Sequence, residues 1–261
     1  MRRPARGLPR RLLMAAGPWA STLVLFLWWF LATRSPASSR PLPSPAEVLA
    51  AGRDLAAEGL LWPSVGTSLA RVLAGLALGV ALAVPAAVLS GASRIGLAVI
   101  DRPVHMLRAI PFPALSPLFI IWLGIDELMK VALIAVGVFG LVYVNVRDAI
   151  RGLDPRLAEL ARAYRLPRVL VFRRILFRGA LPGFFTGLRF AITVAWIALV
   201  TCETVNSTVG IGYVLARAQQ FSRTDQMMLC VLLYALLGLA SEAVVALLER
   251  LLLPWRAAAA R

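Results

Sequence analysis

The stretch LDPRLAELARAYRLPRVLVFRRILFRGALP, residues 153–182, carries seven arginines, although strongly apolar segments flank it on both sides. Asp154 followed by Pro155 is typical of a helix start, with the aspartate as the cap and the proline at the first helical position. Pro167 indicates that this helix ends just before it and that a second helix begins there. We therefore expect a hairpin made of a short helix, a turn and a basic amphipathic helix.

The first helix of this hairpin has an apolar stripe formed by Leu157, Leu160, Ala161 and Tyr164, with charged residues on its other side. Two interpretations fit such an element in a membrane protein. The hairpin could lie on anionic lipid headgroups, or it could dock a soluble partner on the cytoplasmic side.

The composition is that of a polytopic membrane protein with an all-α helical bundle. Of 261 residues, 60% are apolar and only 16% are charged, and the mean hydropathy is +0.79. The net charge is +15, but the arginines flank apolar segments, which argues against nucleic-acid binding. Two cysteines and one histidine provide neither a disulfide framework nor a metal site.

About six spans are expected within one membrane domain, residues 17–255, which follows a basic N-terminus (1–16) and precedes a short tail (256–261). The spans are placed near residues 17–33, 64–90, 104–123, 129–147, 183–203 and 226–249. The third contains AIPFPALSPLFIIWLG, whose three prolines exclude a regular helix in its first half. Irregular backbone at membrane depth is tolerated only beside protein or a water-filled cavity, so this segment is a candidate wall of a pathway.

Basic residues predict the orientation of the chain. Nineteen of the 28 fall on one side of these spans, in residues 1–16, 91–102, 147–178 and the C-terminal end, and six fall on the other. The side with the excess is expected to be cytoplasmic, which places both termini there.

Two further patterns predict local structure. On the outer side, Ser44 before Pro45 is expected to cap a surface helix whose apolar side includes Val48, Leu49 and Leu55. In the second span, Gly75 and Gly79 are four residues apart, a spacing that permits close helix approach within a bundle or across a dimer.

The hairpin resembles the EAA signature of ABC importer permeases, E-A-A-x-x-x-G-x9-I-x-L-P. Glu159, Ala161 and Ile175 match this signature, whereas Arg165 stands where the family has glycine. Phe177-Arg178 replaces the family's Leu-Pro, and a Leu-Pro pair follows at 181–182. A left-handed arginine would cost about 1–2 kcal/mol, so either the turn differs or partner contacts hold it. Blocks in the same order over residues 18–255 resemble the branch for aliphatic sulfonates, taurine and nitrate.

The resemblance implies a type I ABC importer permease fold, in which the hairpin, residues 154–178, holds a coupling helix that docks into a cytoplasmic ATPase. It further implies a permease homodimer, two ATPase copies that bind ATP and Mg, and an extracytoplasmic binding protein. The sequence has no G-x-x-x-x-G-K-[ST] loop, in agreement with a chain that is not itself catalytic and holds no cofactor. The expected coupling residues are Asp154, Leu157, Glu159, Leu160, Ala161, Arg162, Ala163, Tyr164 and Arg165.

The candidate pathway residues are polar or charged side chains in or near the spans. Arg108 and Arg189 are expected to attract an anion, whereas Glu203 would either face a dimer cavity or brace the loop NSTVGIG. The full set is Arg108, Ser116, Arg189, Thr193, Glu203 and Asn206.

Two other classes of function fit the sequence less well. A membrane enzyme would need converging nucleophile, base or metal ligands, which one histidine and scattered acids do not supply. A secondary transporter would be expected to show inverted repeats and paired intramembrane charges, and it would give the basic hairpin no role. Within the importer reading, nitrate, bicarbonate or a heterocyclic precursor remain alternative solutes.

Overall fold

The computed structural model describes residue 20, residues 22–33 and residues 42–254, and this part is helical and without strands, as predicted. The predicted N-terminal and C-terminal segments, 1–16 and 256–261, lie outside it. After a first helix, Thr22–Ala32, the order is α2 (Pro45–Ala57), α3 (Leu61–Ala92), α4 (Arg94–Gly96), η1 (Leu97–Asp101), α5 (Arg102–Ala109), η2 (Phe112–Leu115), α6 (Ser116–Leu123), α7 (Glu127–Arg151), α8 (Pro155–Ala163), α9 (Arg168–Val171), η3 (Phe172–Leu176), α10 (Phe177–Asn206), α11 (Ile211–Gln220) and α12 (Thr224–Leu252).

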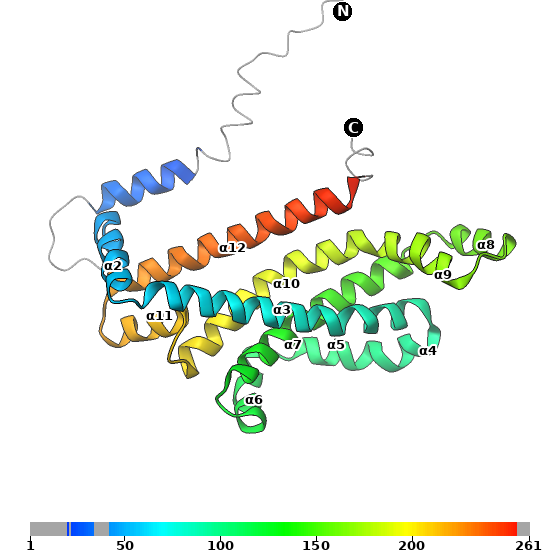
Figure 1. Cartoon of the computed structure of the whole chain (residues 1–261), viewed down its shortest axis with the longest axis horizontal. Coiled ribbons are helices and arrows are strands. Elements are labelled where there is room, and N and C mark those ends of the chain that lie inside the picture. The colour runs from blue at the N-terminus through cyan, green and yellow to red at the C-terminus, as the bar shows by residue number, and fades with distance from the viewer. Residues whose placement is uncertain (1–19, 21, 34–41, 255–261) are drawn as a thin grey trace, which may run out of the picture.

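The helix α7 is the centre of the bundle and packs chiefly on α3 and α10, which run beside it (Figure 1). Glycines make the approach of α3 possible. A Cβ atom added to Gly75 would lie 2.5 Å from Ile134 Cγ2, and one added to Gly79 would lie 2.7 Å from Val138 Cβ. The two predicted glycines therefore allow close packing of α3 on α7 within one chain, with the side chains of α7 directly against the backbone of α3.

Replacing Gly79 with leucine is expected to destabilise the bundle by about 1–3 kcal/mol, because the new side chain overlaps Val138 and the carbonyl of Ala135. Thermal unfolding of the purified chain measures this loss. Gly66→Ala on the same helix is the matched control, because nothing lies within 4 Å of a Cβ there and alanine favours a helix. An equally stable Gly79→Leu variant would contradict this packing.

The predicted third span is broken in the middle. The segment Arg94–Ala109 is helical, Ile110 is extended, and the chain then forms the short 3-10 helix η2 before α6. The two helical parts of this segment, Arg94–Ala109 and Pro113–Leu123, are bent by 90°. Proline has no backbone N–H, so a continuous helix through Pro111 would lose bonds and clash with the preceding turn. The irregular backbone predicted here is confirmed.

Fewer helices than expected are long enough to cross a membrane within the described residues. The first predicted span, near 17–33, is described only as Thr22–Ala32, which is shorter than a span. Four helices qualify, and the bent pair makes a fifth if it counts as one span. The four are Leu61–Ala92, Glu127–Arg151, Val169–Val205 and Thr224–Leu252.

The helix α2 begins as its sequence predicts. Ser44 and Glu47 form a capping box, in which the backbone N–H of Ser44 donates to Glu47 Oε2 at 2.6 Å. Val48 and Leu55 are buried, but Leu49 is 64% exposed, so its place on the apolar side was wrong. Val48 and Leu55 are two turns apart and therefore lie on the same face of the helix. Leu49 is adjacent to Val48 in sequence and therefore points in a different direction.

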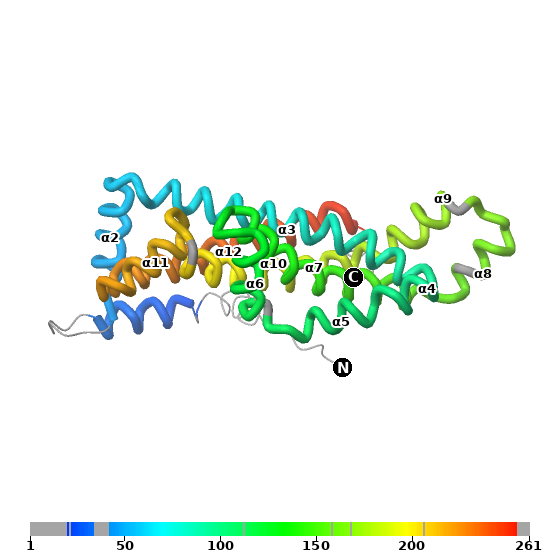
Figure 2. Tube along the Cα trace, turned by 90° about the horizontal axis from the view of Figure 1, so that it is seen from below, coloured from blue at the N-terminus to red at the C-terminus, as the bar shows by residue number. Residues whose placement is uncertain are grey.

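The two ends of the bundle carry different elements. The hairpin of α8 and α9 projects at one end, and α2 and α11 lie at the opposite end, in both views (Figure 2). The continuous helix Val169–Val205 spans 37 residues, or about 55 Å, against a hydrocarbon core of about 30 Å. This helix is therefore long enough to extend beyond the hydrocarbon core.

Candidate functional site: coupling hairpin and translocation pathway

The hairpin helix α8 begins at the predicted cap. The carboxylate of Asp154 accepts a hydrogen bond from the backbone N–H of Arg156 at 2.9 Å, and Pro155 occupies the first helical position. The carboxylate of Asp154 thus satisfies one of the N–H groups of the first turn that have no partner within the helix. Pro155 has no backbone N–H, so no donor is left unpaired at its position.

Most of the apolar side of α8 is uncovered. Leu157 is 40% exposed, Leu160 51% and Tyr164 73%, whereas Ala161 is buried against the chain. Large apolar side chains grouped at the tip of a projecting element are typical of an interaction site. The remaining coupling candidates on this helix, Glu159, Arg162 and Ala163, are also exposed.

The end of α8 keeps the left-handed turn that glycine usually forms. The backbone N–H of Leu166 donates to Ala161 O at 2.9 Å, and that of Arg165 donates to Arg162 O at 3.1 Å. Arg165 has a φ of +48°. This is the Schellman pattern. The predicted alternative of a different turn at Arg165 is therefore wrong, and the alternative that partner contacts hold this turn stays a prediction.

Arg165→Gly is expected to stabilise this turn by about 1 kcal/mol, because glycine adopts positive φ without steric cost. Hydrogen exchange of the Leu166 amide, which depends on the turn, should slow about fivefold. Ser222→Gly, at another positive φ of 51°, should leave this amide unchanged. Unaltered or faster exchange in the Arg165 variant would show that Arg165 is not strained.

The second limb of the hairpin continues directly into the bundle. α9, η3 and α10 form one unbroken helix, with an i→i+5 bond from the N–H of Phe177 to Phe172 O inside it. Turns of this kind occur often at functional sites. The Leu-Pro pair near the family position lies inside α10, where Pro182 is part of the helix.

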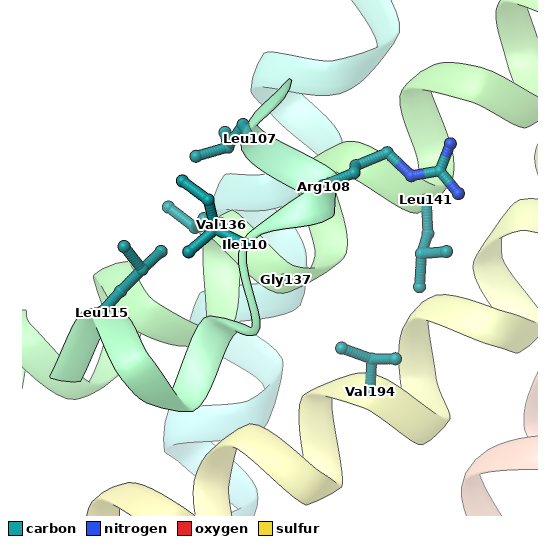
Figure 3. Close-up of a pocket in the computed structure, with 8 residues that line it drawn as sticks. All are labelled: Leu107, Arg108, Ile110, Leu115, Val136, Gly137, Leu141 and Val194. Carbon is teal, nitrogen blue, oxygen red and sulfur yellow. The ribbon is translucent and has the colours of Figure 1, made fainter. Parts of the chain in front are cut away.

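Arg108 borders a cavity of about 170 Å³ between the broken third span, α7 and α10. Figure 3 shows its side chain passing above Leu141, with Val194 of α10 across the cavity. The stem of Arg108 packs over Gly140, where a Cβ would lie 2.4 Å from Arg108 Cγ. The guanidinium thus lies at the edge of a cavity whose other lining residues are apolar.

Ser116 lies at the start of α6, after the break. Its side chain is 6% exposed, and its hydroxyl has no hydrogen-bond partner among the described residues. Buried hydroxyls usually find a partner. Ser116 follows Leu115, which lines the Arg108 cavity.

Arg189 and Thr193 lie elsewhere. They line a groove of about 530 Å³ between α10 and α12, which also contains Glu242 and Glu249. The guanidinium of Arg189 pairs with Glu249 at 2.7 Å. Arg108 and Arg189 therefore border two separate grooves, and only the groove beside Arg108 is otherwise lined by apolar residues.

Glu203 is buried at the opposite end of the bundle from the hairpin, with 1% exposure. Its carboxylate accepts hydrogen bonds from Ser68 Oγ at 2.8 Å, Arg71 Nη1 at 2.7 Å and the backbone N–H of Gly212 at 2.8 Å. Of its two predicted roles, this geometry is the bracing one, since the carboxylate holds the start of α11. The side chain of Asn206 lies outside the described part.

Arg71 links this carboxylate to a second one. Its Nε donates to Glu127 Oε2 at 2.6 Å, its Nη1 also donates to Val209 O at 2.7 Å, and Lys130 donates to Glu127 at 2.8 Å. We call Ser68, Arg71, Glu127, Lys130 and Glu203 the outer polar cluster. It joins α3, α7 and α10 to the loop before α11.

Comparison with known proteins identifies the chain. The family described as binding-protein-dependent transport system inner membrane component matches residues 75–254, which is more than half of the sequence. The chain belongs to this family. The transport permease is 38% identical to a protein of Escherichia coli (strain K12) named as an aliphatic sulfonates transport permease, SsuC, over 95% of each chain. It is 29% identical to the taurine transport system permease TauC of the same strain, over 95% of this chain and 91% of TauC.

The fold agrees with this assignment. An inward-facing structure of the MetNI methionine ABC transporter aligns with a TM-score of 0.58 and 21% identity, covering 70% of this permease and 93% of that chain. The chain is therefore the permease of an ABC importer and a multi-pass protein of the inner membrane. A permease of this kind works with an ATPase and a binding protein.

Residues of the outer polar cluster other than Glu203 were missed as functional candidates. Arg71, Glu127 and Lys130 are charges within or at the ends of spans, and this is the signal that could have found them. Their pairing could not be read from the sequence, because Arg71 and Glu203 are 132 positions apart.

Proposed function

We propose that this permease is the non-catalytic membrane subunit of the importer and that a separate ATPase drives it through α8. The observation that carries the proposal is the projecting α8, with Leu157, Leu160 and Tyr164 exposed on one side. ATP and Mg would be bound by the ATPase, and this chain would hold no cofactor. Movement of α8 would pass into the bundle through the unbroken helix that follows it, as a rigid-body change between two packed states.

Two copies of the permease would form the pathway between them, each carrying one ATPase. The broken segment between α5 and α6 supports this, because irregular backbone at membrane depth needs protein or water beside it. Ile121 and Trp122 of α6 are 77% and 68% exposed in a single chain, which leaves room for the second copy. An extracytoplasmic binding protein would deliver solute at the end that carries α2 and α11.

Both termini would lie in the cytoplasm of a bacterium, on the side of the hairpin, since most of the basic residues fall on that side.

The solute would be a small anion, an aliphatic sulfonate or taurine, as the names of the relatives suggest. Arg108 is the side chain best placed to attract it, because the planar guanidinium can donate paired hydrogen bonds to two oxygens of one oxyanion group. Nitrate, bicarbonate and a heterocyclic precursor would be tested as competitors.

The test is uptake into proteoliposomes that hold the assembled importer, with radiolabelled taurine or an alkanesulfonate, the binding protein outside and ATP on the ATPase side. Arg108→Gln should lower uptake about 10-fold to 100-fold, because a hydrogen bond to a charged group contributes about 1.5–3 kcal/mol. Assembly with the ATPase should be unchanged.

Arg102→Gln, an exposed arginine on the same helix, is the matched control and should transport normally. Uptake that persists without ATP would contradict the importer mechanism. Full uptake of both solutes by the Arg108 variant would contradict the place of Arg108 on the path.

A further inference from the structure

A second cavity, unrelated to the pathway candidates, lies between α3, α7 and the helix that leaves the hairpin. Its volume is about 400 Å³ and its lining is entirely apolar. The side chains that define it are Val80, Val84 and Val88, one turn apart on α3, and Phe172, Phe177 and Phe184 on the facing helix.

Three arginines of the facing helix, Arg173, Arg174 and Arg178, are close in sequence to Phe172, Leu176 and Phe177, which line the end of this cavity nearest the hairpin. The turn at 172–176 has i→i+5 bonding, so one turn there takes between four and five residues. Arg173 therefore lies about one turn before Phe177, which lines the cavity, and before Arg178. Arg173, Arg174 and Arg178 are exposed, and among the described residues none of them has an acidic side chain within ion-pair distance.

The depth of these groups matches a bilayer boundary. Exposed arginines are costly in the hydrocarbon core, and a helix of about 55 Å is long enough, against a core of about 30 Å, to leave the arginines of its first ten residues near the headgroups. Phe177 and Phe184 follow them toward the hydrocarbon. The cavity is therefore apolar, and the helix that borders it carries exposed arginines toward the hairpin.

We propose that this groove binds an anionic phospholipid, with an acyl chain against the three valines and the phosphate on Arg173 and Arg174. Basic pockets between spans on the cytoplasmic side recognise such headgroups. A second copy of the chain fits the groove less well, because it would bring the same arginines to a surface that already carries them. The lipid would join α3 to the helix that leaves the hairpin, and so hold the base of the coupling element.

Native mass spectrometry of the isolated, delipidated permease, titrated with phosphatidylglycerol or phosphatidylcholine, tests this without any partner or solute. The wild type should retain phosphatidylglycerol at least 10-fold more tightly than phosphatidylcholine. Arg173→Gln combined with Arg174→Gln should abolish that preference. Val84→Trp should fill the groove and reduce retention of both lipids.

Two matched variants complete the design. Arg94→Gln combined with Arg102→Gln removes two exposed arginines outside the groove, and Leu82→Trp adds the same ring on an exposed position of α3. Both should bind lipid as the wild type does. Equal retention of the two lipids by the wild type would overturn the proposal.

The proposal would also be overturned if lipid retention changed neither in the double variant Arg173→Gln with Arg174→Gln nor in Val84→Trp. A third overturning result is an arginine variant that keeps its lipid preference but loses the ATPase, because it would assign these arginines to the ATPase interface. Since the lipid measurement uses the permease alone, failure of the proposed transport function would leave it unaffected.

Discussion

Leu160→Asp in α8 should abolish attachment of the ATPase and solute uptake. Leu160 lies at the centre of the exposed apolar side, between Leu157 and Tyr164. A carboxylate there would have to be desolvated on docking, and changes at central contacts cost about 2 kcal/mol or more, a factor of about 30 in affinity. Titration of the purified ATPase onto the reconstituted permease measures the affinity, and uptake by the same vesicles measures transport.

Arg156→Asp is the control for this substitution. It adds a carboxylate to the polar side of the same helix, in the first turn, where a negative charge favours the helix. Its ATPase affinity should stay within about threefold of the wild type. If Leu160→Asp binds the ATPase and transports normally, α8 is not the docking element.

Arg71→Leu should be the most destabilising single change in the outer polar cluster. It leaves the carboxylate of Glu203 buried without its cationic partner, and removal of one member of a buried pair costs about 3–5 kcal/mol. The melting temperature of the purified permease should fall by roughly 10 °C. Limited proteolysis should also cut the loop before α11 faster, because the hydrogen bond from Arg71 to Val209 O is lost.

The double variant Arg71→Leu with Glu203→Gln separates charge from packing. It removes the buried carboxylate and keeps an acceptor for the N–H of Gly212, so it should be more stable than Arg71→Leu alone. Arg223→Leu breaks an ion pair whose arginine is half exposed and should cost less than about 1 kcal/mol. A double variant less stable than Arg71→Leu would contradict the charge argument.

Local features of the chain were predictable because they depend on neighbouring residues. Asp154 and Pro155 start α8, Ser44 starts α2, and the prolines after Ala109 break the third span, each through the backbone bonds that these residues add or remove. The spacing of Gly75 and Gly79 predicted the close approach of a second helix. The spacing alone did not show whether that helix belonged to the same chain.

The features that could not be predicted depend on contacts between distant segments. The five side chains of the outer polar cluster come from three helices, so the spacing within any one helix does not reveal them. The same reason explains why Arg108 and Arg189 looked equivalent in the sequence. Only the packing shows that Arg189 is paired with Glu249, whereas Arg108 borders a cavity.

The proposed coupling mechanism requires that the ATPase attaches at α8, and thiol protection tests this directly. The chain has two cysteines, Cys202 and Cys230, and both are buried. A Leu160→Cys variant would therefore carry one exposed thiol, and Phe221→Cys, 70% exposed near the opposite end, is the control. Adding the ATPase should slow maleimide labelling of the Leu160→Cys variant at least tenfold and leave the Phe221→Cys variant unchanged. Equal labelling of the Leu160→Cys variant with and without bound ATPase would contradict the account.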